Sequence, residues 1–238
     1  MTTARAGLDA PLESVDELAQ SKGRCEATFN RRDALYCVAL LLIGFGVRAL
    51  VVYVFDAPPT WDGAFYQRGA ISIAEGHGYS EAALIAGHAA RLPWSHYPVG
   101  YSALLGATYA LFGAGRHVAT LLNAVIGGCT AALSFAFAFE VLGRARARIA
   151  GALAAIHPGL VLYCALVMTE PLAGFLVLAS GYLALKLGSL RWGAVASGIV
   201  LALSAFVRPQ SLITAPLLLL LFRGNLRRRL SQTALAGA

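Results

Sequence analysis

The sequence predicts an all-α membrane protein: a polytopic helical bundle of about six transmembrane helices, with juxtamembrane helices in a large first outer loop. Hydrophobic residues make up 58% of the chain and charged residues only 13%, whereas a soluble globular domain carries roughly a quarter charged residues. The apolar residues also form long blocks, and basic residues gather between alternate blocks. These observations indicate one membrane module.

The first expected span covers residues 34–55, which is long enough at ~1.5 Å per residue to cross a hydrocarbon layer of ~30 Å. A polar arm, 1–33, precedes it and lacks the pattern of a cleavable signal peptide. A basic tail, 226–238, follows the transmembrane module of residues 34–225. The later apolar blocks predict spans at 117–142, 149–169, 171–187, 192–207 and 211–222.

The apolar stretch 98–112 decides the topology, because a helix of that length reaches only ~22 Å. If it lies along the outer surface, the basic clusters at 144–148 and 227–229 both fall inside, together with the N-terminal arm. That arrangement obeys the positive-inside rule, and a crossing at 98–112 would violate it. We therefore expect both termini to be cytoplasmic and the loop 56–116 to lie outside.

The net charge of +7 belongs to the cytoplasmic loops in this topology. No basic stripe interleaved with aromatic residues is present, so nucleic acid is not an expected partner. The four cysteines are isolated from one another, without the spacing of a metal site or a disulfide framework. No nucleotide-binding or hydrolase motif occurs, and His96 has no partner at metal-ligand spacing. No cofactor or metal site is expected, although dependence on a divalent metal stays open.

Asp62 is the first candidate for chemistry, since it follows the first expected span by seven residues. A helix over about 63–75 would place this carboxylate at its start, where free N–H groups favour negative charge. Tyr66, four residues on, would lie on the same helical face. The pattern fits either a structural helix cap or a functional carboxylate.

Three further charged residues are expected near the same outer face. Arg48 lies inside the first span, where a charge needs protein, water or an anion beside it. Glu170 marks the outer turn before the span at 171–187, and Arg208 ends the span at 192–207. Each has an ordinary interpretation, a salt bridge or a solvated loop end. The functional interpretation of Arg48 is an electrostatic clamp for an anionic substrate, and the convergence of these three residues with Asp62 favours a shared outer site.

The order of these motifs resembles that of the polytopic membrane glycosyltransferases of the GT-C fold, in the branch of the protein mannosyltransferases and aminoarabinose transferases. The resemblance covers roughly residues 35–225. The motifs that carry it are Asp62 with Tyr66, Gly76-His77-Gly78-Tyr79, Tyr97-Pro98-Val99-Gly100-Tyr101, Glu170, and Arg208-Pro209.

The resemblance implies a bacterial inner-membrane enzyme that transfers a hexosyl group, with inversion, from a polyprenyl-phosphate donor. The acceptor would be a hydroxyl of a glycan, lipid or protein at the outer face. Asp62 would act as general base, and Arg48 and Arg208 would stabilise the leaving phosphate. The residues expected to shape the sugar site are Tyr66, His96, Tyr97 and Glu170.

Two departures from the family pattern keep other functions open. Many members carry a second acidic residue directly after the loop aspartate, where this chain has Gly63. Family members usually continue well beyond the length of this chain. One alternative is therefore a non-catalytic or truncated membrane subunit, and another is a transporter of polyprenyl-linked sugars, for which no inverted repeat is visible.

Overall fold

The computed structural model describes residues 28–56, 58–188, 190–222 and 226–237. Most of the predicted N-terminal arm lies outside them. Within the described residues the chain is mostly helical, as predicted, with one small sheet. The elements in chain order are α2 (Arg31–Phe55), α3 (Asp62–Ala74), β1 (Ser80–Ile85), β2 (His88–Pro93), α4 (Gly100–Phe112), α5 (Arg116–Leu142), α6 (Arg144–Ile156), α7 (Pro158–Cys164), α8 (Glu170–Leu187), α9 (Arg191–Val207), the 3₁₀ helix η1 (Pro209–Leu217), α10 (Leu218–Leu221) and α11 (Leu226–Gly237).

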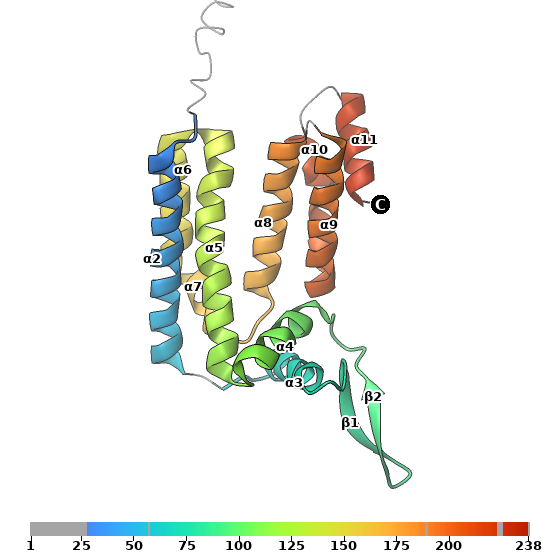
Figure 1. The fold of residues 1–238 in the computed structure, drawn as a ribbon. Coiled ribbons are helices and arrows are strands. Elements are labelled where there is room, and N and C mark those ends of the chain that lie inside the picture. The colour runs from blue at the N-terminus through green and yellow to red at the C-terminus, as the bar shows by residue number, and fades with distance from the viewer. Residues whose placement is uncertain (1–27, 57, 189, 223–225, 238) are drawn as a thin grey trace, which may run out of the picture.

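Three of these helices, α2, α5 and α8, are long and apolar enough to cross a membrane. Helices α6 and α7 pass the same test as a pair, although they are bent by 43° at their junction. Helix α9 contributes a shorter apolar segment from Trp192 to Val207. The long helices run alongside one another, with α2, α5 and α6 in one group and α8, α9 and α11 in another (Figure 1).

The last predicted span differs from the structure. We expected one apolar helix over 211–222, but the chain forms η1 and then the single α-helical turn α10. Pro216 lies inside this segment and has no N–H to donate to a carbonyl of the preceding turn. The run of leucines after it is therefore too short to restore a long helix.

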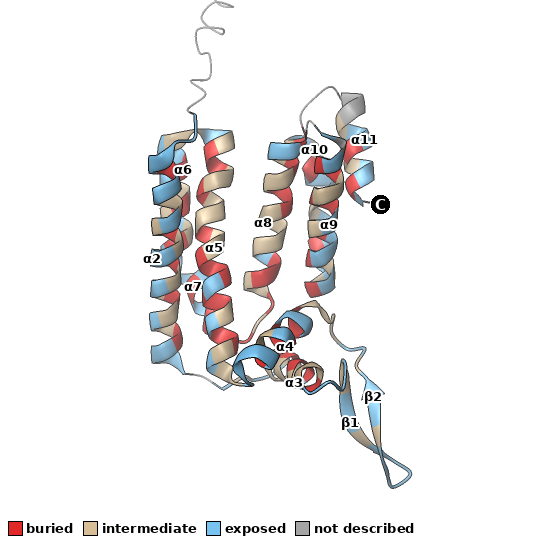
Figure 2. Ribbon diagram, viewed as in Figure 1, coloured by how far each residue is buried: buried red, intermediate tan, exposed pale blue. Residues whose placement is uncertain are grey.

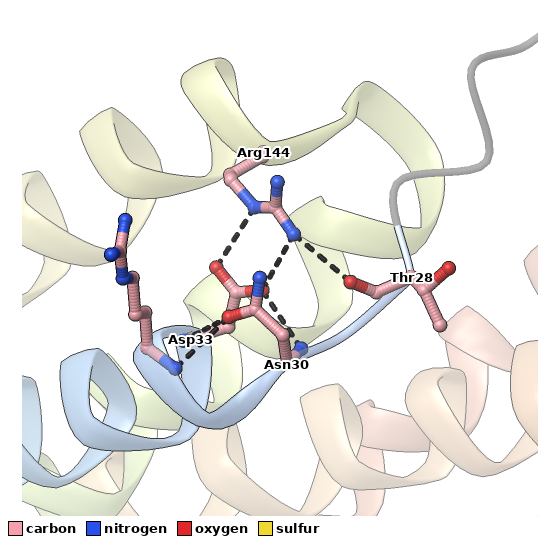
Figure 3. A network of polar contacts seen from close by, with 5 residues as sticks. Thr28, Asn30, Asp33 and Arg144 are labelled. Atoms are coloured by element: carbon pink, nitrogen blue, oxygen red, sulfur yellow. Dashed lines mark hydrogen bonds and ion pairs between the residues drawn. The ribbon is translucent and has the colours of Figure 1, made fainter.

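The start of α2 is fixed to the turn between α5 and α6 by a buried ion pair (Figure 3). The Arg144 guanidinium donates from Nε to Asp33 Oδ1 (3.0 Å) and from Nη2 to Asp33 Oδ2 (2.9 Å). Asp33 is fully buried and also completes a capping box with Asn30. A paired carboxylate tolerates burial that an unpaired one would not, so this contact sets how α2 packs along α5.

Helices α8 and α9 are joined by a reciprocal serine pair. Ser180 Oγ donates to the carbonyl of Ser197 and Ser197 Oγ donates to the carbonyl of Ser180, both at 2.9 Å. Small hydroxyl residues of this kind allow apolar helices to approach closely. Helix α11, in the predicted basic tail, packs along α9 and places Gln232 against the carbonyl of Gly188.

The predicted outer loop closes one end of the bundle. Helices α3 and α4 lie across that end, as Figure 1 shows, and confirm that this loop contains short helices. Their shared core is aromatic, with Tyr66, Tyr101 and Tyr109 buried. Burial therefore holds the loop against the bundle.

A β-hairpin, which we did not expect within the loop 56–116, projects from the same end (Figure 1). Strands β1 and β2 pair antiparallel, from Ser80 with Pro93 to Ile85 with His88. Ala86 and Gly87 form its turn, both at positive φ (50° and 81°), as the tightest hairpin turns require.

Burial follows the packing, with buried residues on the sides of the helices that face their neighbours (Figure 2). Helix α2 instead exposes a long apolar outer side. Its large exposed side chains are Leu35, Val38, Leu42, Ile43, Leu50, Tyr53, Val54 and Phe55.

Candidate functional site

A polar cavity of about 350 Å³ lies at the end of the bundle that α3 and α4 close. Its walls come from the start of α3, the loop before α4, the start of α8 and the junction of α9 with η1. The lining residues are Asp62, Tyr66, His96, Tyr97, Pro98, Met168, Thr169, Glu170, Val207, Arg208, Pro209 and Gln210. Six of the seven residues singled out from the sequence thus meet in one cavity, and Arg48 does not.

Two glycines allow these segments to meet. A Cβ on Gly63 would lie 2.8 Å from the carbonyl oxygen of Val167, so the start of α3 approaches the segment before α8 only because residue 63 has no side chain. A Cβ on Gly100 would lie 2.5 Å from the carbonyl oxygen of Phe206. Gly63 therefore has a packing role here.

Asp62 is the first residue of α3, and the N-cap position belongs to Trp61. The helix start has no side-chain cap. Asp62 Oδ1 instead accepts a hydrogen bond from Tyr97 Oη at 2.6 Å. The backbone of Trp61 has φ 48°, a conformation that costs a residue with a side chain roughly 1–3 kcal/mol. Asp62 is therefore not the N-cap residue of α3, although it lies in the first turn, where free N–H groups favour its negative charge.

Aromatic rings form one wall beside this carboxylate. The Tyr97 ring lies 5.2 Å from that of Tyr66 and 4.8 Å from that of His96, centroid to centroid, in edge-to-face arrangements. The Phe65 ring also packs against Tyr97, with a centroid distance of 5.5 Å. Burial raises the pKa of Tyr66, and the hydrogen bond to Asp62 raises the pKa of Tyr97 to about 12. Both hydroxyls therefore stay protonated at neutral pH.

Another part of the cavity wall carries an ion pair. Arg208 Nη1 lies 2.5 Å from Glu170 Oε1, with about a third of each side chain exposed. Glu170 opens α8, where the helix N-terminus favours a negative charge, and Thr169 Oγ1 donates to its other oxygen at 3.4 Å. Arg208 caps the end of α9 in an extended conformation. The cavity thus holds two carboxylates and one guanidinium.

Arg48 lies in a different place from the one we expected. Its side chain is 1% exposed and donates to the carbonyl oxygens of Gly44 (2.9 Å), Ala155 (2.7 Å) and Ala154 (2.9 Å). It lines a second cavity, of about 400 Å³ and mostly apolar, between α2, α5, α7 and α8. Glu170 lines both cavities.

The break between α6 and α7 explains this placement. Pro158 has no N–H to donate to Ala154 four residues earlier, so carbonyls of the last turn of α6 lack helical partners. These carbonyls carry the negative end of the helix dipole, which compensates a buried cation. Neither the salt bridge nor the anion contact considered for Arg48 is seen: the hydrogen bonds of its Nη atoms among the described residues go to backbone oxygens.

Two polar lining residues, Thr169 and Gln210, were not among the predicted site residues. Each is next to a recognised motif, directly before Glu170 and directly after Arg208-Pro209, which was the available signal. The hydrogen bond between Tyr97 and Asp62 joins residues 35 positions apart and has no local signal. Within the described residues no group of His, Cys, Asp and Glu side chains forms a metal site.

Comparisons of this chain with protein-family models, with curated proteins and with solved structures find no match.

Proposed function

We propose that this protein is a membrane glycosyltransferase of the GT-C type, which transfers a sugar from a polyprenyl-phosphate donor to an acceptor hydroxyl. The observation that supports this most is the meeting of Asp62, the Tyr97 hydroxyl and the Glu170–Arg208 pair in one polar cavity at the end of an apolar bundle. General base, sugar wall and anion-binding cation are the parts that such a transfer needs.

Asp62 is the general base of the proposed reaction. The acceptor oxygen attacks the anomeric carbon, and its proton passes to the Asp62 carboxylate. Asp62 Oδ1 already accepts an O–H donor at 2.6 Å, a distance suited to proton transfer from a hydroxyl. Because Tyr97 keeps its own proton, with a pKa of about 12, it orients the carboxylate and does not replace it as base.

Arg208 stabilises the leaving group. As the new bond forms, the bond between the anomeric carbon and the phosphate oxygen breaks, and that oxygen keeps the electron pair. The negative charge that develops on the lipid phosphate needs a cation, and a guanidinium binds phosphate oxygens in a bidentate manner. Arg208 is the one Arg or Lys among the described residues that line the cavity. No covalent enzyme intermediate forms, so the anomeric configuration inverts.

The membrane placement is part of the proposal. The chain crosses a bacterial inner membrane at α2, α5, the α6–α7 pair, α8, α9 and the η1–α10 segment, with both termini cytoplasmic. The exposed apolar side of α2 suits contact with lipid. The polar cavity then opens on the outer face, and Arg144 with its neighbours lies on the cytoplasmic side. The lipid tail of the donor and the surrounding lipids are its membrane partners.

The test of function is transfer of labelled sugar from polyprenyl-phosphate donors to an acceptor panel in membranes. We expect transfer by the wild type and a loss of roughly 10²–10⁴-fold in Asp62→Asn, the usual contribution of a general base. Asp56→Asn is the matched control, because Asp56 pairs with Arg116 and His117 outside the cavity. Equal activity in all three proteins would remove Asp62 from the mechanism, and no transfer by the wild type would favour a non-catalytic subunit.

The topology has a separate test, labelling of single cysteines by a membrane-impermeant thiol reagent from the outside of intact cells. Cys25, Cys37, Cys129 and Cys164 are first replaced by serine or alanine. We expect labelling of Glu81→Cys in the exposed hairpin and of Arg116→Cys, with Arg146→Cys protected until the membrane is opened. Labelling of Arg146→Cys from outside would overturn the orientation.

A further inference from the structure

Arg208, the cation that would bind the phosphate of the proposed donor, already forms an ion pair with a carboxylate. Arg208 contacts Glu170 at 2.5 Å, and no Lys and no second Arg lines this cavity among the described residues. A phosphate that binds Arg208 must therefore share the guanidinium with a carboxylate or displace it. Either way the phosphate binds beside a negative charge.

Glu170 is held in this position. It is the first residue of α8, followed by Pro171, so its backbone is fixed by the helix start. Thr169 donates a hydrogen bond to Oε2, and Arg208 contacts Oε1. Asp62 adds a second carboxylate from α3, held by Tyr97 on another wall. His96, which also lines the cavity, packs against Tyr97.

The donor and the product of the proposed reaction differ in charge. A sugar phosphodiester carries one negative charge, whereas the lipid phosphate left after transfer is a monoester. Its second ionisation lies near pH 6, so at neutral pH it approaches two negative charges. Repulsion from a nearby carboxylate grows with the charge of the phosphate, and Glu170 therefore opposes the product more than the donor.

We propose that Glu170 is a specificity-determining residue, which makes Arg208 favour a prenyl phosphodiester over a prenyl phosphate monoester and so promotes release of the product. This inference rests on the proposed function, since it takes the prenyl phosphodiester as the ligand. Glu170 contacts the binding guanidinium and has no part in the proton transfer. Its charge, rather than its hydrogen bonds, sets the preference.

The test measures binding without any sugar transfer. The probes are a short-chain prenyl phosphate and its monomethyl ester, which share one lipid chain and differ by one charge. Their dissociation constants are measured at pH 7.5 for the full-length protein in nanodiscs of neutral lipid. The quantity of interest is the ratio of the monoester constant to the diester constant. We expect this ratio to fall about fivefold in Glu170→Gln, the size of one screened charge repulsion at a partly exposed site.

Two variants serve as controls. Glu170→Asp keeps the charge and should keep the wild-type ratio. Glu140→Gln removes a carboxylate outside the cavity, which pairs at 2.7 Å with Lys186 at the other end of α8. This variant should also keep the wild-type ratio. If Glu170→Gln does not fold, Glu170→Ala removes the same charge and carries the same expectation.

The outcomes separate this inference from the function on which it rests. An unchanged ratio in Glu170→Gln overturns the role of Glu170, even if the wild type transfers sugar. A lowered ratio without sugar transfer by the wild type keeps the charge discrimination and overturns the transferase. No saturable binding of either probe to the wild type overturns both.

Discussion

Two cavities of similar size share Glu170 in their walls, yet their arginines have different environments. In the mostly apolar cavity, Arg48 is 1% exposed and bonds to backbone carbonyls. In the polar cavity, Arg208 is about a third exposed and pairs with a carboxylate. Arg48 donates to carbonyls that the break between α6 and α7 leaves without helical partners. Arg208 lies where segments from four parts of the chain meet.

This difference separates structural from functional charge. A guanidinium whose two Nη atoms donate to main-chain oxygens, as in Arg48, is fixed in place, and moving it would leave those oxygens without a donor in an apolar interior. A guanidinium held by one partly exposed carboxylate can exchange that partner at small cost. Substitution of Arg48 should therefore lower stability, and substitution of Arg208 should impair the proposed sugar transfer.

The largest expected effect is on folding, from Arg48→Met. The carbonyls of Ala154 and Ala155 would lose their donor, and each unsatisfied buried acceptor costs about 1–3 kcal/mol. We expect the free energy of unfolding to fall by about 2–5 kcal/mol, measured by thermal melting in detergent. Arg146→Met, at an exposed position, is the control. A wild-type melting temperature in Arg48→Met would contradict the structural role.

Arg208→Gln should instead impair transfer. Loss of the charge that stabilises the leaving phosphate is expected to lower kcat/KM by about 10²-fold, with a melting temperature close to that of the wild type because the ion pair is partly exposed. Arg116→Gln, which breaks the pair with Asp56 at the same end of the molecule, is the matched control. Equal losses in both variants would indicate a general electrostatic effect.

Tyr97→Phe should have a smaller effect. Removing the hydroxyl that orients Asp62 is expected to slow transfer about fivefold, the value of one net hydrogen bond. The hydrogen bond to Asp62 raises the pKa of Tyr97 from 10.0 to about 12. Its stabilisation is therefore complete below pH about 10 and is lost as the pH rises through about 12. Wild-type rate profiles should show no Tyr97 titration below pH 10, and Tyr53→Phe, an exposed tyrosine, is the control.

The smallest expected effect is that of Ser197→Ala. It removes the hydroxyl bond from α9 to the carbonyl of Ser180, and such bonds between apolar helices contribute about 0.6 kcal/mol on average. A melting temperature lowered by a few degrees, with unchanged transfer, would fit a purely packing role. Ser95→Ala, at an exposed position in the loop before α4, gives the comparison.

The sequence predicted those parts of the fold that depend on local pattern. Apolar length identified α2, α5 and α8, and the helix over about 63–75 appeared as α3 (Asp62–Ala74). The hairpin was missed because its alanine-rich strands contain no aromatic residue and only one β-branched residue, Ile85, whereas such residues mark strands. The break at η1 depends on Pro216, which lies within a leucine-rich run. The prediction followed the hydropathy of that run and did not account for the N–H that proline lacks.

The site was predictable where charge stood out against an apolar background, as for Asp62, Glu170 and Arg208. Arg48 also stood out as a charge in an apolar segment, but its side chain lies in the other cavity and donates to carbonyls of α6. Hydropathy does not show which carbonyls a proline break leaves without a donor. The contact between Tyr97 and Asp62 depends on how α3 and α4 pack across the end of the bundle, which no local pattern contains.

The most direct test of the account is to locate the phosphate of a bound donor. A prenyl phosphodiester with a photoactivatable diazirine beside its phosphate would be cross-linked to the wild-type protein in nanodiscs, and the labelled residues mapped by mass spectrometry. We predict labelling at Met168–Glu170 and Val207–Gln210, which line the polar cavity. Labelling confined to Gly159, Leu160 and Tyr163, beside Arg48, would contradict the assignment of the polar cavity as the catalytic site.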